Sequence, residues 1–531
     1  MVSPVCIDST VERLTPVVNE LSTTNNEVFQ AEFHSLEQYL EPFTENQSHI
    51  AFLSFNHWQF AINALTETAV SAHELGADVT IGLWADDLPI RDTGWTTDRR
   101  IAKILNSPGI DSTARSALIQ FGLTKSDFAR PPIRNWKQQP TTKPPVRMVR
   151  SEIRKWKYQG AQMGRSILQV HPDSNTPIRD DLLWPSKWVE QSAKSFMWVF
   201  DQTIKLIQDK GITAIVLYNG RFTHDQAAAA AAQKLGVKVL YYDAGGLDTG
   251  FDLTTGSTHD WDLLQIRMLD MANNWDSATA NQIGSTWFLN RQSHAEAGVK
   301  LYVELQQHGN TGELPDAQKL VVFFSSSGDE IAELDLAWEQ FFNSQENALK
   351  VLSKVCAEIP GTKVVVRTHP HMRLKPKQDL ADWVEAVDSA NVDLHIGPDS
   401  TVDSYELMRK ADVVVTYGST SGVEAGFLGK PVIVMGPSAY NKLGCALEVF
   451  NADQLRIAIE IPPAPNSSAA LSYGLMMQRR GFNYTHLKRT TRGTSMLAGV
   501  EIKPPNELVR KLSHALAART TRRLLGFYNR V

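Results

Sequence analysis

Short apolar runs alternate with amphipathic stretches through most of the chain, which is the pattern of strand, helix and strand in a parallel α/β sheet. In the first half, the expected strands are His49–Phe55, Asp78–Trp84, Thr213–Tyr218 and Val237–Tyr242, and the expected helices are Trp58–Leu75 and the alanine-rich stretch around Ala227–Ala232. We therefore predict a first Rossmann-like domain over residues 1–312, with a helical and basic insertion around residues 100–200.

The second half repeats the alternation. Here the expected strands are Leu320–Phe324, Lys363–Arg367, Asp412–Thr416 and Pro431–Met435, and the expected helices are Glu346–Ile359, Thr401–Lys410 and Gly422–Leu428. They predict a second Rossmann-like domain over residues 313–500, joined to the first near residues 306–318. Two such sheets would face each other across a cleft at their carboxyl ends. An amphipathic helix at 504–527 is expected to pack across both domains.

Composition narrows the class of protein. The 531 residues are 42% hydrophobic and 21% charged, which excludes a disordered chain, and a net charge of -5 gives no reason to expect nucleic acid as a partner. Cys6, Cys356 and Cys445 are too few and too far apart for a disulfide framework or a cysteine zinc site. No apolar run of membrane-spanning length occurs, so a cytoplasmic protein is expected.

The strongest chemical signal is a loop of small and hydroxyl residues between a buried strand and a helix. It consists of Gly418, Ser419, Thr420, Ser421 and Gly422. Backbone amides, hydroxyls and the positive end of the helix dipole would converge there, so we favour nucleotide-phosphate binding over simple N-capping. Glu424, in the first turn, suits a ribose contact or a charge placed to complement the helix N-terminus.

A second signal is the segment VVVRTHPH, which ends a predicted strand. Arg367, His369 and Pro370 follow its buried part, and an imidazole at that position can donate a hydrogen bond to a departing phosphate. A histidine bound to a loop carbonyl is an equal alternative. A zinc site with His371 lacks a third ligand nearby, since His395 belongs to another predicted strand.

The first domain carries a candidate general base. Asp243 ends a strand before Gly245, and Asn219 and Arg221 end the preceding strand of the same sheet. Asp243 would accept a proton, while Arg221 would orient an anionic substrate or keep Asp243 ionised. Turn stabilisation by Asp and Asn is the alternative for each.

Two further motifs are weaker. Ser325 and Ser326 end the first strand of the second domain, where they suit a phosphate or sugar contact or a capped turn equally well. The DxD of Asp260 and Asp262 precedes a predicted helix, so capping is the better interpretation than metal binding. No cofactor or metal is expected.

The segment 130–157 is strongly basic and contains Trp136 and Trp156. It suits peripheral contact with an anionic membrane surface, on the inner face of the cytoplasmic membrane, and the C-terminal helix would extend that surface. A solvated proline-rich loop is the alternative, and it is slightly favoured.

Taken together, the motifs resemble a known family. The HP segment, the serine loop and the following GVEAGFLGKPV resemble GT-B glycosyltransferases of the capsule polysaccharide biosynthesis family, over residues 210–445. Asp243, the His369-Pro370 pair and the serine loop match, in order, the acidic, HP and serine motifs of related sialyl and Kdo transferases. Ala244 stands where an acidic pair would continue.

We therefore predict a metal-independent transfer from a nucleotide-sugar donor, such as a CMP-linked acidic sugar, to a saccharide or glycolipid acceptor, with inversion if the displacement is single. Asp243 would be the base, and His369 and the serine loop would hold the donor phosphate. A sugar-nucleotide epimerase of the same fold and a catalytically silent assembly or export factor are the alternatives.

Overall fold

The computed structural model describes most of the chain. The described residues are 35–45, 48–85, 88, 104–105, 107–129, 144–145, 148–170, 183–293, 304–327, 333, 341–490, 493–513 and 515. Much of the basic segment 130–157 and most of the expected helix at 504–527 lie outside these ranges. Among the described residues, no helix is long and apolar enough to cross a membrane.

The first sheet has five strands in the order β2-β1-β3-β4-β5. Its strands are β1 (His49–Ser54), β2 (Asp78–Leu83), β3 (Ala214–Tyr218), β4 (Lys238–Ala244) and β5 (Phe251–Thr254). The first four are parallel and β5 runs antiparallel to β4 at the edge. Because every residue of β3 is buried, both faces of the sheet must be covered by helices.

Two helix layers supply that cover. One face packs with α3 (Gln59–Glu74) and α5 (Ile110–Phe121), and the other with α8 (Ser186–Lys210) and α9 (Thr223–Lys234). The alanine run of α9 keeps its side chains small, so the helix lies close to β3 and β4. Short helices α6 (Arg150–Ile153) and α7 (Met163–Leu168) precede α8, and α2 (Leu36–Thr44) packs at the start of the described chain.

The second sheet has six parallel strands in the order β11-β10-β9-β6-β7-β8. They are β6 (Lys319–Phe324), β7 (Thr362–Arg367), β8 (Leu394–Ile396), β9 (Val413–Thr416), β10 (Val432–Val434) and β11 (Leu447–Glu448). Numbered along the chain, this is the 3-2-1-4-5-6 order of the Rossmann fold, with its switch point between β6 and β9.

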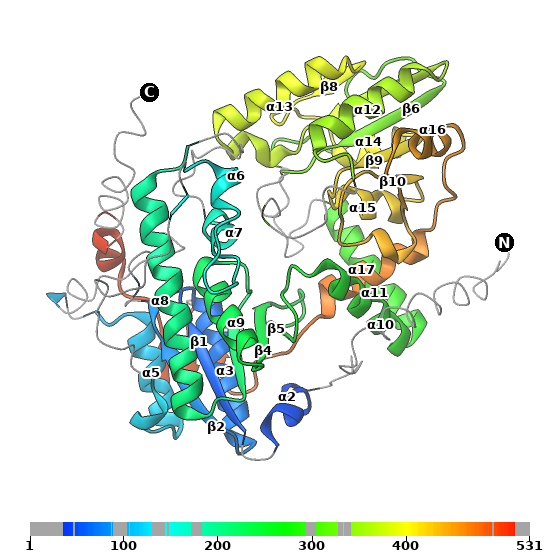
Figure 1. Cartoon of the computed structure of the whole chain (residues 1–531). Coiled ribbons are helices and arrows are strands. Elements are labelled where there is room, and N and C mark those ends of the chain that lie inside the picture. Colours follow the sequence, from blue (N-terminus) through cyan, green and yellow to red (C-terminus); the bar gives the residue numbers. More distant parts are fainter. Residues whose placement is uncertain are drawn as a thin grey trace.

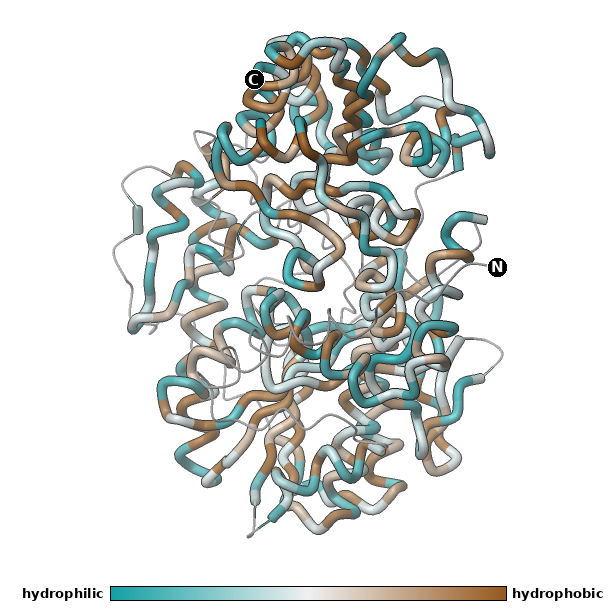
Figure 2. Tube along the Cα trace, turned by 90° about the vertical axis from the view of Figure 1, so that its right-hand side faces the viewer, coloured by the Kyte–Doolittle hydropathy of each residue, from teal (hydrophilic) through white to brown (hydrophobic). Residues whose placement is uncertain are grey.

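Five helices alternate with these strands or follow them. They are α12 (Gln345–Ala357), α13 (Lys377–Ala390), α14 (Ser404–Lys410), α15 (Ser421–Phe427) and α16 (Ala452–Glu460). Core residues gather on both faces of the sheet. We call the part of the molecule built on the first sheet the first lobe and the part built on the second sheet the second lobe. Figure 2 shows the hydrophobic stretches of the trace running mainly through the interior of each lobe. The predicted fold class, α/β with two Rossmann-like parallel-sheet domains, is confirmed, as are the strands predicted for both halves.

The chain passes between the two lobes more than once. Helices α10 (Trp261–Asn274) and α11 (Ser277–Gln292) follow the first sheet but pack with α17 (Ser467–Arg479), which follows the second. After α17 the chain crosses back to the first lobe, as Figure 1 shows. There it forms a small sheet, β12 (Lys488–Arg489), β13 (Ser495–Leu497) and β14 (Val500–Ile502), whose residues join the core beneath α3 and α5. The domain boundary at residue 500 stays a prediction.

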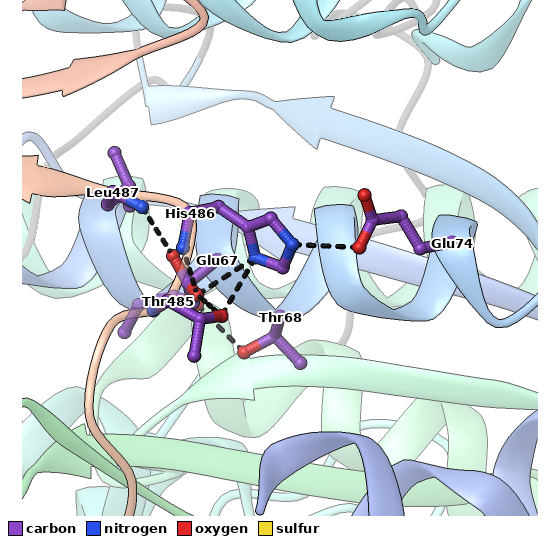
Figure 3. Close-up of polar contacts among 7 residues, drawn as sticks. Glu67, Thr68, Glu74, Thr485, His486 and Leu487 are labelled. Atoms are coloured by element: carbon purple, nitrogen blue, oxygen red, sulfur yellow. Dashed lines mark hydrogen bonds and ion pairs between the residues drawn. The ribbon is translucent and has the colours of Figure 1, made fainter.

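Glu67 fixes the returning chain to the first lobe. This fully buried carboxylate on α3 accepts hydrogen bonds from the backbone N–H groups of Thr485 (2.6 Å), His486 (2.9 Å) and Leu487 (2.9 Å). The ring of His486 also bonds Glu67 (3.0 Å) and, through its other nitrogen, Glu74 (2.8 Å), as Figure 3 shows. A buried carboxylate with this many donors is satisfied, so it holds residues 485–487 at a defined place.

Candidate active site

The carboxyl end of β4 carries the predicted base, Asp243. Its Oδ1 accepts a hydrogen bond from the N–H of Ala244 (2.7 Å), and its Oδ2 accepts one from Nδ2 of Asn219. Burial raises the pKa of Asp243 above the ordinary value, although the Ala244 bond and the charge of Arg480 act in the opposite direction. A carboxylate with a raised pKa is better matched to accepting a proton near neutral pH.

The turn after β3 aims Asn219 at this carboxylate. Asn219 has a φ of 51° and Gly220 a φ of 77°, so both lie in the left-handed region that Asn and Gly tolerate best. A side chain at Gly220 would also collide with the ring of Tyr241, 2.5 Å away. The tight turn therefore depends on this residue pair and brings two predicted site residues, Asn219 and Asp243, into contact.

The cation acting on Asp243 is Arg480, which sequence reasoning missed. The predicted role of Arg221, to orient an anionic substrate or keep Asp243 ionised, stays a prediction. The charge of Arg221 acts on His259, together with that of Arg480. Arg480 lies far along the chain, directly after α17, so no local pattern in the sequence could place it beside the end of β4.

Backbone bonds hold Arg480 against the loop that follows Asp243. The N–H of Gly246 donates to the carbonyl of Arg480 (2.9 Å), and the N–H of Leu247 donates to that of Met477 (3.0 Å). A Cβ at Gly245 would lie 2.9 Å from the backbone nitrogen of Phe251, so this predicted site residue is needed for a close backbone approach. The end of α17 is thus part of the candidate site.

On the second sheet, the HP segment and the first serine turn lie together. The Oγ of Ser325 accepts from the N–H of His369 (2.8 Å), and the N–H of Ser325 donates to the carbonyl of Arg367 (3.1 Å). Pro370 begins the 3-10 turn Pro370–Leu374, which carries the chain away from the strand. Two predicted site segments therefore share one corner of the sheet.

The contacts of His369 define its tautomer. Its Nδ1 accepts a hydrogen bond from the N–H of His371 (3.1 Å), so the neutral ring carries its proton on Nε2. That proton is the one a departing phosphate oxygen could accept. The backbone of this segment thus prepares the imidazole as a donor without requiring it to be charged.

Arg367 and Ser326 have internal partners. The guanidinium of Arg367 is buried, which lowers its pKa to about 10, and its Nη1 donates to the carbonyl of Gly397. The backbone N–H of Ser326 donates to Oε1 of Gln345 (2.6 Å). For both residues the structure gives a local stabilising contact, and their predicted donor contact stays a prediction.

The serine loop follows β9, on the other side of the switch point from Ser325. Ser419 Oγ accepts from the N–H of Ser421 (3.3 Å) and donates to its hydroxyl (3.2 Å), a contact of the capping kind that the sequence left as an alternative. Thr420, at the N-cap position of α15, is exposed and its side chain makes no cap hydrogen bond. The loop thus leaves Thr420 exposed and Ser421 partly exposed.

Two glycines and a tyrosine fix the shape of this loop. Gly418 has a φ of 77°, and a Cβ there would lie 2.4 Å from the carbonyl of Pro437. At Gly422 a Cβ would lie 2.1 Å from the hydroxyl of Tyr440, which itself donates to the carbonyl of Ser419 (2.6 Å). The loop can therefore follow this path only with glycine at both ends.

Glu424 forms a buried ion pair. Its Oε1 accepts hydrogen bonds from Nε (2.9 Å) and Nη2 (2.7 Å) of Arg291 on α11. Its position is set by this pair, which neither of the two interpretations drawn from the sequence included. The pair links α15, at the candidate site, to α11, which packs into the core of the second lobe, and the predicted ribose contact of Glu424 stays a prediction.

The DxD motif has the role expected of it. Asp260 caps α10, since its Oδ1 accepts from the N–H of Leu263 (3.0 Å), and Asp262 pairs with Lys442 (2.6 Å). Among the described residues, no group of three or more His, Cys, Asp or Glu side chains could hold a metal ion. His395 bonds the hydroxyl of Thr368 (2.8 Å).

A buried ion pair joins the two lobes near these strand ends. Glu333, in the segment after β6, accepts hydrogen bonds from Nε of Arg150 (2.6 Å) and Nε of Arg154 (2.9 Å), both in the insertion of the first domain. The side chains of Glu333 and Arg150 are each 1% exposed. Through Arg150 and Arg154, residues 148–157 of the basic segment thus contact the second lobe.

Comparison with known proteins agrees with the resemblance expected from the sequence. Residues 335–477 match the model of the capsule polysaccharide biosynthesis protein family. This region contains the HP segment and the serine loop. No curated protein matches the sequence.

Among solved structures, two similar ones are KpsC enzymes of Thermosulfurimonas dismutans. The beta Kdo 2,4 transferase is 15% identical, with a TM-score of 0.34 over 60% of this chain and 88% of its own. The beta Kdo 2,7 transferase is 16% identical, with a TM-score of 0.31 over 52% and 80%. The UDP-GlcNAc 2-epimerase of Neisseria meningitidis is 10% identical, with a TM-score of 0.24 over 82% and 97%.

Proposed function

We propose that the protein is a glycosyltransferase of capsule or surface polysaccharide synthesis, which moves a sugar from a nucleotide-activated donor to a saccharide or glycolipid acceptor. One observation carries this proposal. Ser325 and the serine loop flank the switch point of a Rossmann-ordered sheet, inside or beside the segment that matches the capsule family. Nucleotides bind at such switch points in open α/β sheets.

The reaction needs a base and a stabilised leaving group. Asp243 removes the proton of an acceptor hydroxyl, whose oxygen then forms a bond to the anomeric carbon of the donor sugar. The bond from that carbon to the phosphate oxygen then breaks. The Nε2–H of His369 and the hydroxyls of Thr420 and Ser421 donate hydrogen bonds to the phosphate as it leaves.

A single displacement inverts the anomeric centre. The side chains assigned here supply proton removal and phosphate stabilisation without a metal ion, so the transfer is proposed to be metal-independent. The donor is proposed to be a CMP-linked acidic sugar. Peripheral membrane contact through residues 130–157 belongs to the same proposal, and residues 130–143 lie outside the described part of the chain.

Nucleotide binding tests the proposal directly. CMP, CDP, UDP and GDP are added separately and thermal unfolding is followed, because a ligand that binds only the folded state at 100 times its Kd stabilises by about 2.7 kcal/mol. His369→Ala and Ser421→Ala should each weaken the best nucleotide about tenfold. His73→Ala, far from the site on α3, is the matched control.

Turnover then separates the alternatives. Release of nucleotide only when a saccharide acceptor is present supports transfer, whereas interconversion of the sugar nucleotide without acceptor indicates an epimerase. Nucleotide binding without any turnover indicates a silent assembly factor. If none of the four nucleotides stabilises the protein, the proposal fails.

A further inference from the structure

Four loops meet at the carboxyl edge of the first sheet. The turn after β3 lies against the loop before α10, because the hydroxyls of Ser257 (3.4 Å) and Thr258 (3.3 Å) both donate to the carbonyl of Asn219. The loop after β4 joins the end of α17 through the bond from Gly246 to Arg480. Residues from distant parts of the chain therefore surround Asp243.

This cluster contains buried polar atoms that have no partner within the described protein. They are Nε of Arg221, Nε of Arg480, Nε2 of His259 and Oδ1 of Asn219. Neither arginine forms an ion pair with a described residue. Asn219 is only 5% exposed, so its carbonyl oxygen meets almost no solvent. Buried polar atoms without hydrogen-bond partners are costly, which makes such a concentration informative.

The neighbouring carboxylates do not supply the missing acceptors. Asp252 receives both Nη1 (2.9 Å) and Nη2 (2.8 Å) of Arg267, and Asp243 is bonded to Asn219 and Ala244. Arg221 is held in place by packing, since its guanidinium carbon lies 5.0 Å from the centre of the Phe222 ring. The guanidinium groups of Arg221 and Arg480 therefore each keep an Nε–H donor without an acceptor among the described residues.

His259 stays neutral in this environment. Burial, and the charges of Arg221 and Arg480, lower its pKa to about 3. Its Nε2 can therefore donate or accept a hydrogen bond at working pH without adding charge, and the positive charge of the cluster comes from the two arginines.

We infer that Arg221, Arg480 and His259 form a subsite for an oxyanion carried by the acceptor saccharide, a sugar carboxylate or a sugar phosphate. The subsite lies beside Asp243, so a bound anion would place a hydroxyl of the same sugar within reach of the base. The arginines then act as specificity-determining residues. The inference rests on the proposed function in one respect, the identification of the anion's carrier as the acceptor.

Ligand-observed NMR titration of the full chain tests this subsite without any turnover. The probes are glucuronate, glucose 6-phosphate and glucose, which share a ring but differ in charge. One of the two anionic probes should bind saturably while glucose does not. The anion that binds more tightly shows whether the subsite prefers a sugar carboxylate or a sugar phosphate. Arg480→Gln and Arg221→Gln should each weaken that probe about tenfold or more, the usual effect of losing a charge-assisted bond.

Arg479→Gln is the matched control. Arg479 is the neighbour of Arg480, but it is exposed and pairs with Asp248 at the surface (3.3 Å), so its loss should leave probe binding unchanged. Thermal unfolding of each variant shows that it is folded. Equal binding of glucose and both anions, or wild-type affinity in both Arg221→Gln and Arg480→Gln, overturns the inference. Nucleotide binding, measured on the same samples, reports separately on the proposed function.

Discussion

At the scale of single residues, the proposed base makes the sharpest prediction. Asp243→Asn preserves the shape of the side chain but removes the group that accepts the proton, so transfer should fall ~10²–10⁴-fold. Donor-nucleotide affinity should change little, because the residues proposed to bind the donor lie at the strand ends of the second sheet. Initial rates and nucleotide binding are measured on the same variant. Asp248→Asn, in the exposed part of the same loop, should retain full activity.

The surroundings of Asp243 also predict a pH dependence. Burial raises the pKa of this carboxyl, so the acid limb of kcat/KM should lie above the ordinary carboxyl range. The positive charge of Arg480 opposes that shift, and Arg480→Gln should therefore move the acid limb to higher pH. A pH–rate profile that does not move in Arg480→Gln contradicts the assigned electrostatic role.

Sequence reasoning found the residues whose position follows from strand ends. Asp243, His369 and Ser419 were predicted because the carboxyl ends of parallel strands gather at one edge of a sheet. Arg480 and Arg291 could not be found in this way. Each comes from a helix that packs into the core of the second lobe, or from the residue directly after it, and only the tertiary path of the chain brings it to the candidate site.

At the scale of elements, the sequence predicted the regular alternation of strands and helices in both sheets but not the departures from it. Every strand predicted from an apolar run is present, because buried parallel strands have few alternatives. The antiparallel pairing of β5 with β4 has no signature in so short a strand. The return of β12–β14 to the first lobe is held by scattered apolar residues and by Glu67, a single buried acid inside a helical pattern, and neither has a local signature in the sequence.

The serine loop makes a prediction about backbone conformation. Gly418→Ala must place a side chain at a φ of 77° and 2.4 Å from the Pro437 carbonyl, whereas Gly429→Ala meets a similar φ of 74° with 3.4 Å of room. The left-handed conformation alone costs about 1–2 kcal/mol. Chemical unfolding should therefore show a larger loss for Gly418→Ala, and nucleotide affinity should fall in that variant only.

At the scale of the whole molecule, the attachment of the returning chain should depend on pH. Burial alone would lower the pKa of His486, but its bonds to Glu74 and Glu67 outweigh burial and raise it above 6.5. The charged form therefore stabilises the folded state fully below pH 6.5, and this contribution is lost as pH rises through the raised pKa. His486→Gln should destabilise the protein more at about pH 6 than at about pH 9, because the charged ring contributes stability only at the lower of these two values.

Glu67→Gln provides a second measure of the same attachment. It places an amide where several buried N–H groups need an acceptor, at an expected cost of about 1–3 kcal/mol in the free energy of unfolding. Glu74 is half exposed and Glu74→Gln should cost less than about 1 kcal/mol. Equal effects in the two variants would contradict the role assigned to the buried carboxylate.

We expect the buried ion pair of Arg150 and Glu333 to help hold the two lobes together. In Glu333→Gln, the buried guanidinium of Arg150 loses its counter-charge, and breaking a buried pair on one side costs about 3–5 kcal/mol. Because separation of the lobes would return Arg150 to water, the variant should relieve this cost by opening. Small-angle scattering should then show a larger radius of gyration than in the wild type.

Glu304→Gln removes an exposed pair with Arg373 and should leave the radius unchanged, since surface pairs contribute little. A wild-type radius in Glu333→Gln, together with wild-type stability, would mean that the pair does not hold the lobes together.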